Sequence, residues 1–287
     1  MADPMTVDCI LLVDGRRVDA ADLIGSGIDG FIIRNGGHVL KTPKLFGRLL
    51  SDGTIEADSE NDIHLNHLEL EKQAYERLRG VPGVAKCIEC TSNGILLKYY
   101  RNGALSEYIS CHKPPSMPWR WRWVLQATEI IALCHQRGVL VFDIALRNFL
   151  LADDFSLRII DFANSSLVPQ SVDITEANLD GCTARLDLFH LANVIYSIMT
   201  WQTFSVDCAM ESEWPTIDQI PDLEGLDFGQ IIHACWNREY TTIQEFALEI
   251  RLCAKTSSSA GLLESQNQCN TQAAVSDRSS SPVLPPA

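Results

Sequence analysis

The spacing of apolar residues changes once along this chain, after Asn102 and Gly103, and this change constrains the fold more than any other feature. Before it, short β-like runs such as 31–33 and 94–100 alternate with turn signals such as 35–37. After it, apolar residues recur every three or four positions, as on the buried face of a helix. The first such stripe comprises Trp119, Trp123, Ala127, Ile130 and Cys134. The pattern predicts an α+β fold, with a small β-rich lobe followed by a larger, mainly helical lobe.

A single helix is expected within the β-rich part, from about Ile63 to Arg79. Leu68, Tyr75 and Leu78 recur at helical offsets and share one face with Glu71. This carboxylate therefore points with the apolar stripe toward the protein, where a buried charge needs a cationic partner. The candidate partner is Lys41, which closes the apolar run that begins at Val39.

Two further helices are predicted in the second lobe. An apolar stripe runs through 188–199, and Asp187 precedes it at the place of a capping side chain. A last helix follows Thr242, and Glu245 three positions on completes a capping box.

These patterns divide the chain into four parts. Residues 1–14 are expected to form an N-terminal extension, 15–101 the small lobe and 102–254 the large lobe. Residues 255–287 are rich in serine, proline and glutamine and are expected to be a disordered tail, because they cannot bury enough apolar surface to offset ordering.

Charge and cysteine content narrow the classes of partner and compartment. The formal net charge of −14 argues against nucleic acid and against an anionic membrane surface, because both attract basic proteins. The ten cysteines are scattered singly, apart from Cys87 and Cys90, and no leader-like segment opens the sequence, so an intracellular setting, cytoplasmic or nuclear, is expected. One C-x-x-C without a second pair or histidines at ligand spacing favours two ordinary half-buried thiols on a strand over a zinc site.

A glycine-rich segment offers the first chemical motif. Gly25, Gly27 and Gly30 form a G-x-G-x-x-G, which lets backbone N–H groups approach phosphate oxygens. A β-like run follows the motif and not a helix, which argues against a dinucleotide-binding fold. On its own the motif is also compatible with a glycine-rich hairpin turn.

Oxygen-bearing side chains at two later positions give the strongest signal. Asp143 and Asn148 stand in the spacing D-x-x-x-x-N just ahead of an apolar run, and Asp161 follows another β-like run, 157–160. Carboxylate and amide oxygens suit Mg²⁺, and the spacing is that of a catalytic carboxylate followed by a metal ligand.

In their order, these motifs resemble those of protein kinases over roughly residues 15–254. The similarity is greatest to the compact kinase-like proteins of fungi, in which Asp-Phe-Ala-x-Ser-Ser commonly replaces Asp-Phe-Gly; here residues 161–166 read Asp-Phe-Ala-Asn-Ser-Ser. The resemblance implies a two-lobed enzyme that binds ATP with magnesium and transfers the γ-phosphoryl group to a protein hydroxyl.

The resemblance also implies a role for each motif residue. The three glycines would cover the phosphates, and Lys41 would hold the α- and β-phosphates while paired with Glu71. Asp143 would accept or orient the proton of the substrate hydroxyl, and Asn148 with Asp161 would hold Mg²⁺. The apolar positions expected around the adenine are Ile32, Val39, Leu97 at the gatekeeper position and Leu150, with Tyr99 and Tyr100 contributing backbone groups.

The chain departs from the kinase pattern at several points. Val141 and Phe142 replace the His-Arg that precedes the catalytic aspartate, so activity is expected not to need phosphorylation of the activation loop. Val141 is still expected to pack against Phe162, with Tyr75 next in that stack. Ala145 and Arg147 leave the acceptor type open, with Ser/Thr preferred over Tyr. No Ala-Pro-Glu closes the activation segment, and Asp187 is expected to brace the catalytic loop.

Two other functions remain as alternatives. A small-molecule phosphotransferase of the aminoglycoside or choline kinase type also uses D-x-x-x-x-N and a later aspartate. A pseudokinase would scaffold partners while binding ATP weakly or not at all. A regulatory protein partner is a further expectation.

Overall fold

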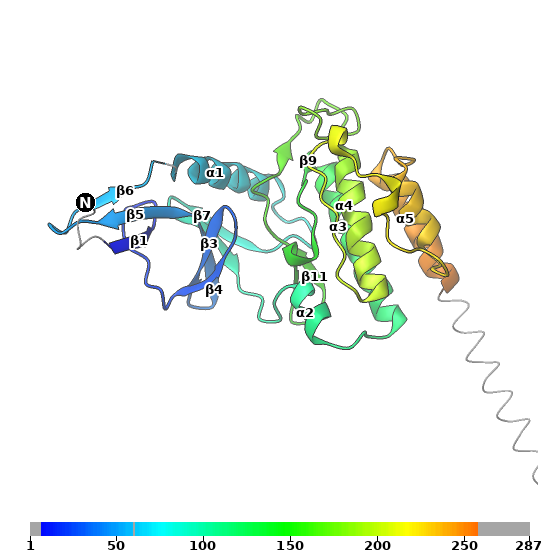
Figure 1. The fold of residues 1–287 in the computed structure, drawn as a ribbon, viewed down its shortest axis with the longest axis horizontal. Coiled ribbons are helices and arrows are strands. Elements are labelled where there is room, and N and C mark those ends of the chain that lie inside the picture. The colour runs from blue at the N-terminus through cyan, green and yellow to red at the C-terminus, as the bar shows by residue number, and fades with distance from the viewer. Residues whose placement is uncertain (1–6, 60, 258–287) are drawn as a thin grey trace, which may run out of the picture.

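The computed structural model describes residues 7–59 and 61–257 and divides the chain into two lobes (Figure 1). Strands and one helix make up the N-terminal lobe, and helices dominate the C-terminal lobe, so the expected α+β, two-lobed, kinase-like architecture is confirmed. Residues 255–257 end a helix, and the rest of the expected tail, 258–287, lies outside the described residues. No described helix is long and apolar enough to cross a membrane.

The small lobe is built on a five-stranded antiparallel sheet in which Lys41 has a central place. Lys41 lies opposite Ile32 on one neighbouring strand and opposite Ile95 on the other. In sheet order the strands are β2 (Leu23–Ser26), β3 (Gly30–Asn35), β4 (His38–Pro43), β8 (Gly94–Lys98) and β7 (Cys87–Thr91).

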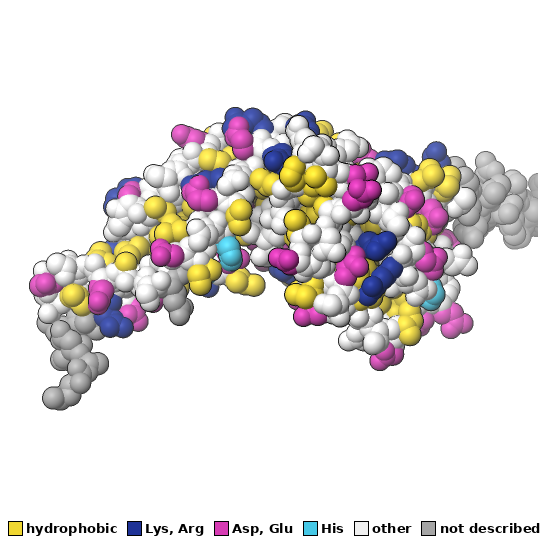
Figure 2. Space-filling view, turned by 90° about the horizontal axis from the view of Figure 1, so that it is seen from above, with side chains coloured by type: hydrophobic (Ala, Val, Ile, Leu, Met, Phe, Trp, Pro, Cys, Tyr) yellow, Lys and Arg dark blue, Asp and Glu magenta, His cyan; other side chains and the backbone are white. Residues whose placement is uncertain are grey.

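A second, three-stranded sheet extends the small lobe, which narrows toward this end in the space-filling view (Figure 2). Its order is β1 (Val7–Leu11), β5 (Leu45–Leu49) and β6 (Ile55–Ala57), all antiparallel. Only Lys44 separates β4 from β5, so the chain passes directly from one sheet into the other. Strand β1 lies in the stretch that the sequence placed in an N-terminal extension, and it pairs with β5 along its whole length.

Helix α1 (Asn61–Arg77) covers this lobe with the face that the sequence predicts. Leu68, Tyr75 and Leu78 are buried together with Glu71, whose exposed fraction is only 1%. The helical phase therefore carries one carboxylate into the interior beside the apolar side chains.

The large lobe packs around α3 (Met117–Gln136) and α4 (Ala184–Thr200), which contact each other along their length (Figure 1). Burying aromatic residues such as Trp123 and Phe189 contributes about 1.5–3 kcal/mol for each side chain. The remaining helices are α2 (Leu105–Cys111), α5 (Gly229–Trp236) and 243–257, with short 3₁₀ turns η1 (Leu146–Asn148), η2 (Glu211–Glu213) and η3 (Ile217–Gln219). Two short antiparallel strand pairs complete the large lobe. One is the hairpin of β10 (Phe149–Leu151) and β11 (Leu157–Ile159), and the other joins β9 (Val139–Leu140) to β12 (Ser166–Leu167).

The predicted helix caps have different outcomes. Thr242 and Glu245 form the capping box, with each backbone N–H donating to the other residue's side chain. Asp187 is not a cap, and that prediction is wrong. Helix α4 starts one turn earlier, after Thr183, whose hydroxyl accepts from the Arg185 N–H. Asp187 is therefore inside the first turn and fully buried, where its carboxylate serves other backbone groups.

Candidate functional site

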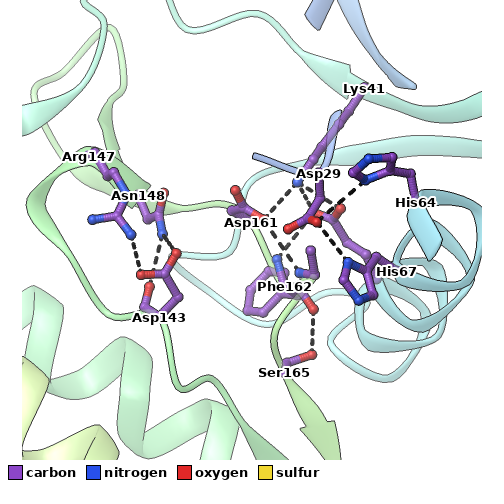
Figure 3. A network of polar contacts seen from close by, with 12 residues as sticks. Asp29, Lys41, His64, His67, Asp143, Arg147, Asn148, Asp161, Phe162 and Ser165 are labelled. Atoms are coloured by element: carbon purple, nitrogen blue, oxygen red, sulfur yellow. Dashed lines mark hydrogen bonds and ion pairs between the residues drawn. The ribbon is translucent and has the colours of Figure 1, made fainter. Parts of the chain in front are cut away.

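The two lobes meet at a lysine held between two carboxylates (Figure 3). Lys41 Nζ, from β4, lies 2.9 Å from Glu71 Oε1 and 2.7 Å from Glu71 Oε2 on α1. The same ammonium lies 2.7 Å from Asp161 Oδ1 in the large lobe. One cation thus joins the central strand and the helix of the small lobe to the segment that follows β11.

Burial makes this ion triad strongly interdependent. Burial alone lowers the pKa of Lys41, but Glu71 and Asp161 more than offset this and raise it. Burial raises the pKa of Glu71 against the opposite effect of Lys41. Burial also opposes ionisation of Asp161, yet Lys41 and the Ala163 N–H hold its pKa below the usual value. Lys41 is therefore charged at neutral pH, and it is compensated from both lobes.

The backbone after β11 is shaped around the triad. Asp161 has a φ of 67°, a left-handed conformation that costs about 1–3 kcal/mol for a residue other than glycine and persists only where neighbours fix it. Glu71 Oε1 accepts from the Phe162 N–H at 3.2 Å, and Tyr75 meets the Phe162 ring edge to face at 5.1 Å. Val141 is buried in the large core cluster that also contains Tyr75 and Phe162, and its packing against Phe162 stays a prediction.

A second polar group surrounds Asp143 (Figure 3). Asn148 Nδ2 donates to Asp143 Oδ2 at 3.0 Å and to the Asp143 carbonyl at 2.9 Å, and Arg147 donates to Oδ1 at 2.5 Å. Each carboxylate oxygen of Asp143 thus has its own donor, which fixes its orientation. The Ile160 N–H donates to the Asn148 carbonyl at 2.9 Å, so this group adjoins the strand that leads to Asp161.

Asp187 supports the loop that carries Asp143. Its Oδ2 accepts from the Val141 N–H at 2.8 Å and its Oδ1 from the Phe142 N–H at 2.7 Å. His135 Nε2 lies 2.8 Å from Oδ2. Phe142 has a φ of 60°, so the carboxylate holds a strained turn immediately before Asp143.

The glycine-rich segment is tied to α1 by a contact that the sequence analysis did not identify. Asp29, within the motif, lies 2.7 Å from His67 Nδ1 and 3.7 Å from His64 Nδ1 (Figure 3). His64, His67 and Glu71 recur at offsets of three and four, and this shared helix face was the available signal. Gly30 has a steric reason to be glycine, because an added Cβ would lie 2.8 Å from the Thr42 carbonyl oxygen.

The residues expected around an adenine differ in their placement. Val39 and Leu97 are buried opposite each other on β4 and β8, and Ile32 is half-buried against the same core. Tyr99 is 40% exposed. Tyr100 turns inward, and its hydroxyl accepts from the Lys86 N–H at 3.1 Å. The half-buried Leu150 packs against the cluster that contains Tyr100.

The structure thus brings the candidate catalytic and metal-binding residues into two groups, one at Lys41 and one at Asp143 (Figure 3). Within residues 7–59 and 61–257, no three His, Cys, Asp or Glu side chains are arranged to hold a metal ion by themselves. On the face shown in Figure 2, acidic side chains are spread along the molecule and basic ones lie among them. The net negative charge is therefore not gathered in one patch on this face.

Comparison with known proteins gives a distant similarity. No family model matches the chain. The mouse and human proteins named NUAK family SNF1-like kinase 1 are each 26% identical to it over 157 residues. That region is 53% of this chain and 23% of each relative, so the chain matches about a quarter of their length. This similarity supports a relationship to the protein kinase superfamily.

Proposed function

We propose that this chain is an ATP-dependent protein kinase that transfers the γ-phosphoryl group to protein hydroxyls, with Ser/Thr preferred over Tyr. The observation that carries the proposal is the Lys41 ammonium held between Glu71 of the small lobe and Asp161 of the large lobe. Phosphoryl transfer needs positioned cations and oriented carboxylates more than a covalent nucleophile.

The donor chemistry fits ATP with Mg²⁺. Asp161 uses Oδ1 for Lys41 and the Ala163 N–H, so Oδ2 lies outside those bonds. Asn148 uses its amide nitrogen on Asp143, so its amide oxygen lies outside those bonds. These two hard oxygens would hold Mg²⁺ together with phosphate oxygens. When bound, the ion would neutralise charge on the transferring group.

Asp143 would orient the acceptor hydroxyl and take up its proton. Two donors hold its carboxylate, and Asp187 fixes the turn before it, so little reorganisation is needed when substrate arrives. Arg147 adds a positive charge beside the reacting group. The charged Lys41 would bind the phosphates beneath the glycines of 25–30.

The base would lie against Ile32, Val39, Leu97 and Leu150, with backbone groups of Tyr99 and Tyr100 alongside. Apolar side chains on β3, β4, β8 and β10 support this assignment, because nucleotide bases are commonly held between apolar surfaces with a few backbone hydrogen bonds. The inward packing of Tyr100 is compatible with it, since only its backbone is required.

We also propose that activity does not need a phosphate on the activation segment. Arg77 of α1 donates to the Val168 carbonyl at 2.7 Å and to the Gly138 carbonyl at 3.3 Å, which fastens the start of this segment through backbone groups. Protein freed of phosphate by a phosphatase, which is then removed, should keep its activity. Loss of all activity after this treatment would contradict the proposal.

The function is tested with radiolabelled ATP, Mg²⁺ and three kinds of acceptor in separate reactions: a panel of basic proteins, aminoglycosides and choline. Wild type should label serine or threonine, and Asp143→Asn should lower the rate by about 10²- to 10⁴-fold. Asp52→Asn, at the exposed turn between β5 and β6, is the matched control and should retain full activity. ATP binding without transfer above the Asp143→Asn rate would establish the scaffold function instead. Labelling of aminoglycoside or choline alone would establish the small-molecule phosphotransferase.

An intracellular setting, cytoplasmic or nuclear, and a regulatory protein partner belong to the same proposal. The cysteines of the described residues are all free of disulfides, which supports a reducing compartment.

A further inference from the structure

Two thiols that the sequence analysis treated as ordinary lie close together on one edge of the small lobe. Cys87 Sγ and Cys90 Sγ are 3.8 Å apart, both on β7. Strand β7 is the last strand of the five-stranded sheet, so its outer side carries no further strand. Cys90 is exposed and Cys87 half-buried, so a small reagent can reach the pair.

A break in strand register explains the proximity. Residues three apart in a regular strand point to opposite faces of the sheet, which would keep the two thiols apart. Here Cys87 pairs with Leu97, but Glu89 pairs with Leu96, so Ile88 is an extra residue on β7. With one extra residue in between, two residues three positions apart point to the same face of the sheet, and the bulge also brings them closer along the strand. The bulge therefore turns this C-x-x-C into a facing pair of sulfurs.

The charged neighbours of the pair come from the last turn of α1 and the turn that follows it. Glu76 and Arg79 form an ion pair there at 2.5 Å. Burial is the main reason that the pKa of Cys87 is raised to about 12, with Cys90 adding to it and Arg79 opposing it. Cys87 therefore remains a protonated thiol at neutral pH, and the exposed Cys90 is the sulfur that an oxidant meets first.

We propose that Cys87 and Cys90 are a redox modification site that closes to an intramolecular disulfide when a peroxide is the oxidant. Cys90 attacks the peroxide O–O bond and becomes a sulfenic acid, with release of water. The Cys87 sulfur then attacks the Cys90 sulfur, and a second water leaves. Both thiol protons leave in the two waters, and the two electrons lost by the sulfurs reduce one hydrogen peroxide.

The geometry requires only a local movement. A disulfide needs the sulfurs at about 2.05 Å, so they must approach by less than 2 Å from their present 3.8 Å. Because β7 is a bulged edge strand, this change disturbs strand pairing on one side only, the side that faces β8. A dithiol reductant reverses the bond by thiol–disulfide exchange.

Peptide mapping of the full chain tests the site directly. Trypsin cleaves after Lys86 and Lys98, so both sulfurs fall in one peptide that contains no other cysteine. After hydrogen peroxide and alkylation without reduction, this peptide should be unalkylated and lighter than the dithiol peptide by two hydrogen atoms. Treatment with dithiothreitol before alkylation should restore two alkylated thiols.

Cysteine variants test whether the disulfide forms between Cys87 and Cys90. Cys90→Ser should abolish the lighter peptide and leave Cys87 alkylated, whereas Cys111→Ser, at another exposed cysteine, should leave the lighter peptide unchanged. The wild-type peptide alone can overturn the proposal, independently of how the variants fold. Sulfinic or sulfonic acid on either sulfur without the lighter peptide, or dimers cross-linked between chains, would each do so. The readout does not depend on kinase activity.

Discussion

Replacing Asp187 by asparagine should destabilise the fold although the two side chains have almost the same shape. Oδ1 accepts from the Phe142 N–H at 2.7 Å, and Oδ2 accepts from the Val141 N–H at 2.8 Å and contacts His135 at 2.8 Å. An amide can offer its oxygen to only one of these backbone donors. Its NH₂ group must face the other donor, in a site that is fully buried.

The magnitude follows from these contacts. A hydrogen bond to a charged group contributes about 1.5–3 kcal/mol, and a buried donor left unpaired costs about 1–3 kcal/mol. Asp187→Asn loses one charge-assisted bond and weakens the others, so we expect a loss of about 2–4 kcal/mol in the free energy of unfolding. Asp187→Ala leaves both backbone donors unpaired and should cost about 3–5 kcal/mol. Either loss is a large part of the ~5–15 kcal/mol that holds a typical domain folded.

Urea unfolding followed by circular dichroism, with both lobes fitted together, measures these losses. Asp173→Asn is the control, because its carboxylate serves an exposed turn at Thr175, and its unfolding midpoint should match wild type. An Asp187→Asn midpoint equal to that of the control would refute the reasoning. Such a result would mean that the turn at Phe142 holds its conformation without the carboxylate.

Three further outcomes are expected. Glu71→Gln should lose about 1–3 kcal/mol of unfolding free energy in urea, since Asp161 still compensates Lys41; a loss above that range would show that Glu71 alone compensates the lysine. Asp29→Asn should weaken ATP binding in calorimetry while changing stability by less than about 1 kcal/mol, because its contact with His67 is partly exposed; unchanged binding would exclude a role in holding the glycine segment. Burial lowers the pKa of His190 in the folded protein, although Asp187, Asp207 and Asp143 oppose this shift. As pH falls through 6.5, the unfolded chain therefore binds a proton at His190 before the folded chain does. Stability should then fall by at most about 1.4 kcal/mol per pH unit, and His190→Gln should lose this slope; an identical slope in the variant would assign it to other groups.

The sequence alone predicts features that depend only on the residue spacing within one helix, strand or loop. The helical phase places Glu71 among buried apolar residues, and the D-x-x-x-x-N spacing puts Asn148 within reach of Asp143 through one 3₁₀ turn. The change of periodicity after Gly103 separates the two lobes, because period-2 and helical patterns bury different sets of side chains.

Features that depend on contacts between segments far apart in the chain could not be predicted from the sequence. Strand β1 exists because it pairs with β5, more than thirty residues away in the chain, and nothing in 7–11 itself fixes that partner. The contact of Asp29 with His67 joins a loop to a helix only after both have folded. The proximity of Cys87 and Cys90 depends on an extra residue in β7 that becomes visible only against β8.

The direct passage from β4 to β5 through Lys44 has a consequence for where this chain can be shortened. A version that begins near residue 15 would lack β1 and leave β5 with an unpaired edge along Leu45 to Leu49. Bare strand edges invite intermolecular pairing, so such a chain would tend to self-associate. Because β5 follows β4 directly, intermolecular pairing at β5 would also displace β4, the strand that carries Lys41.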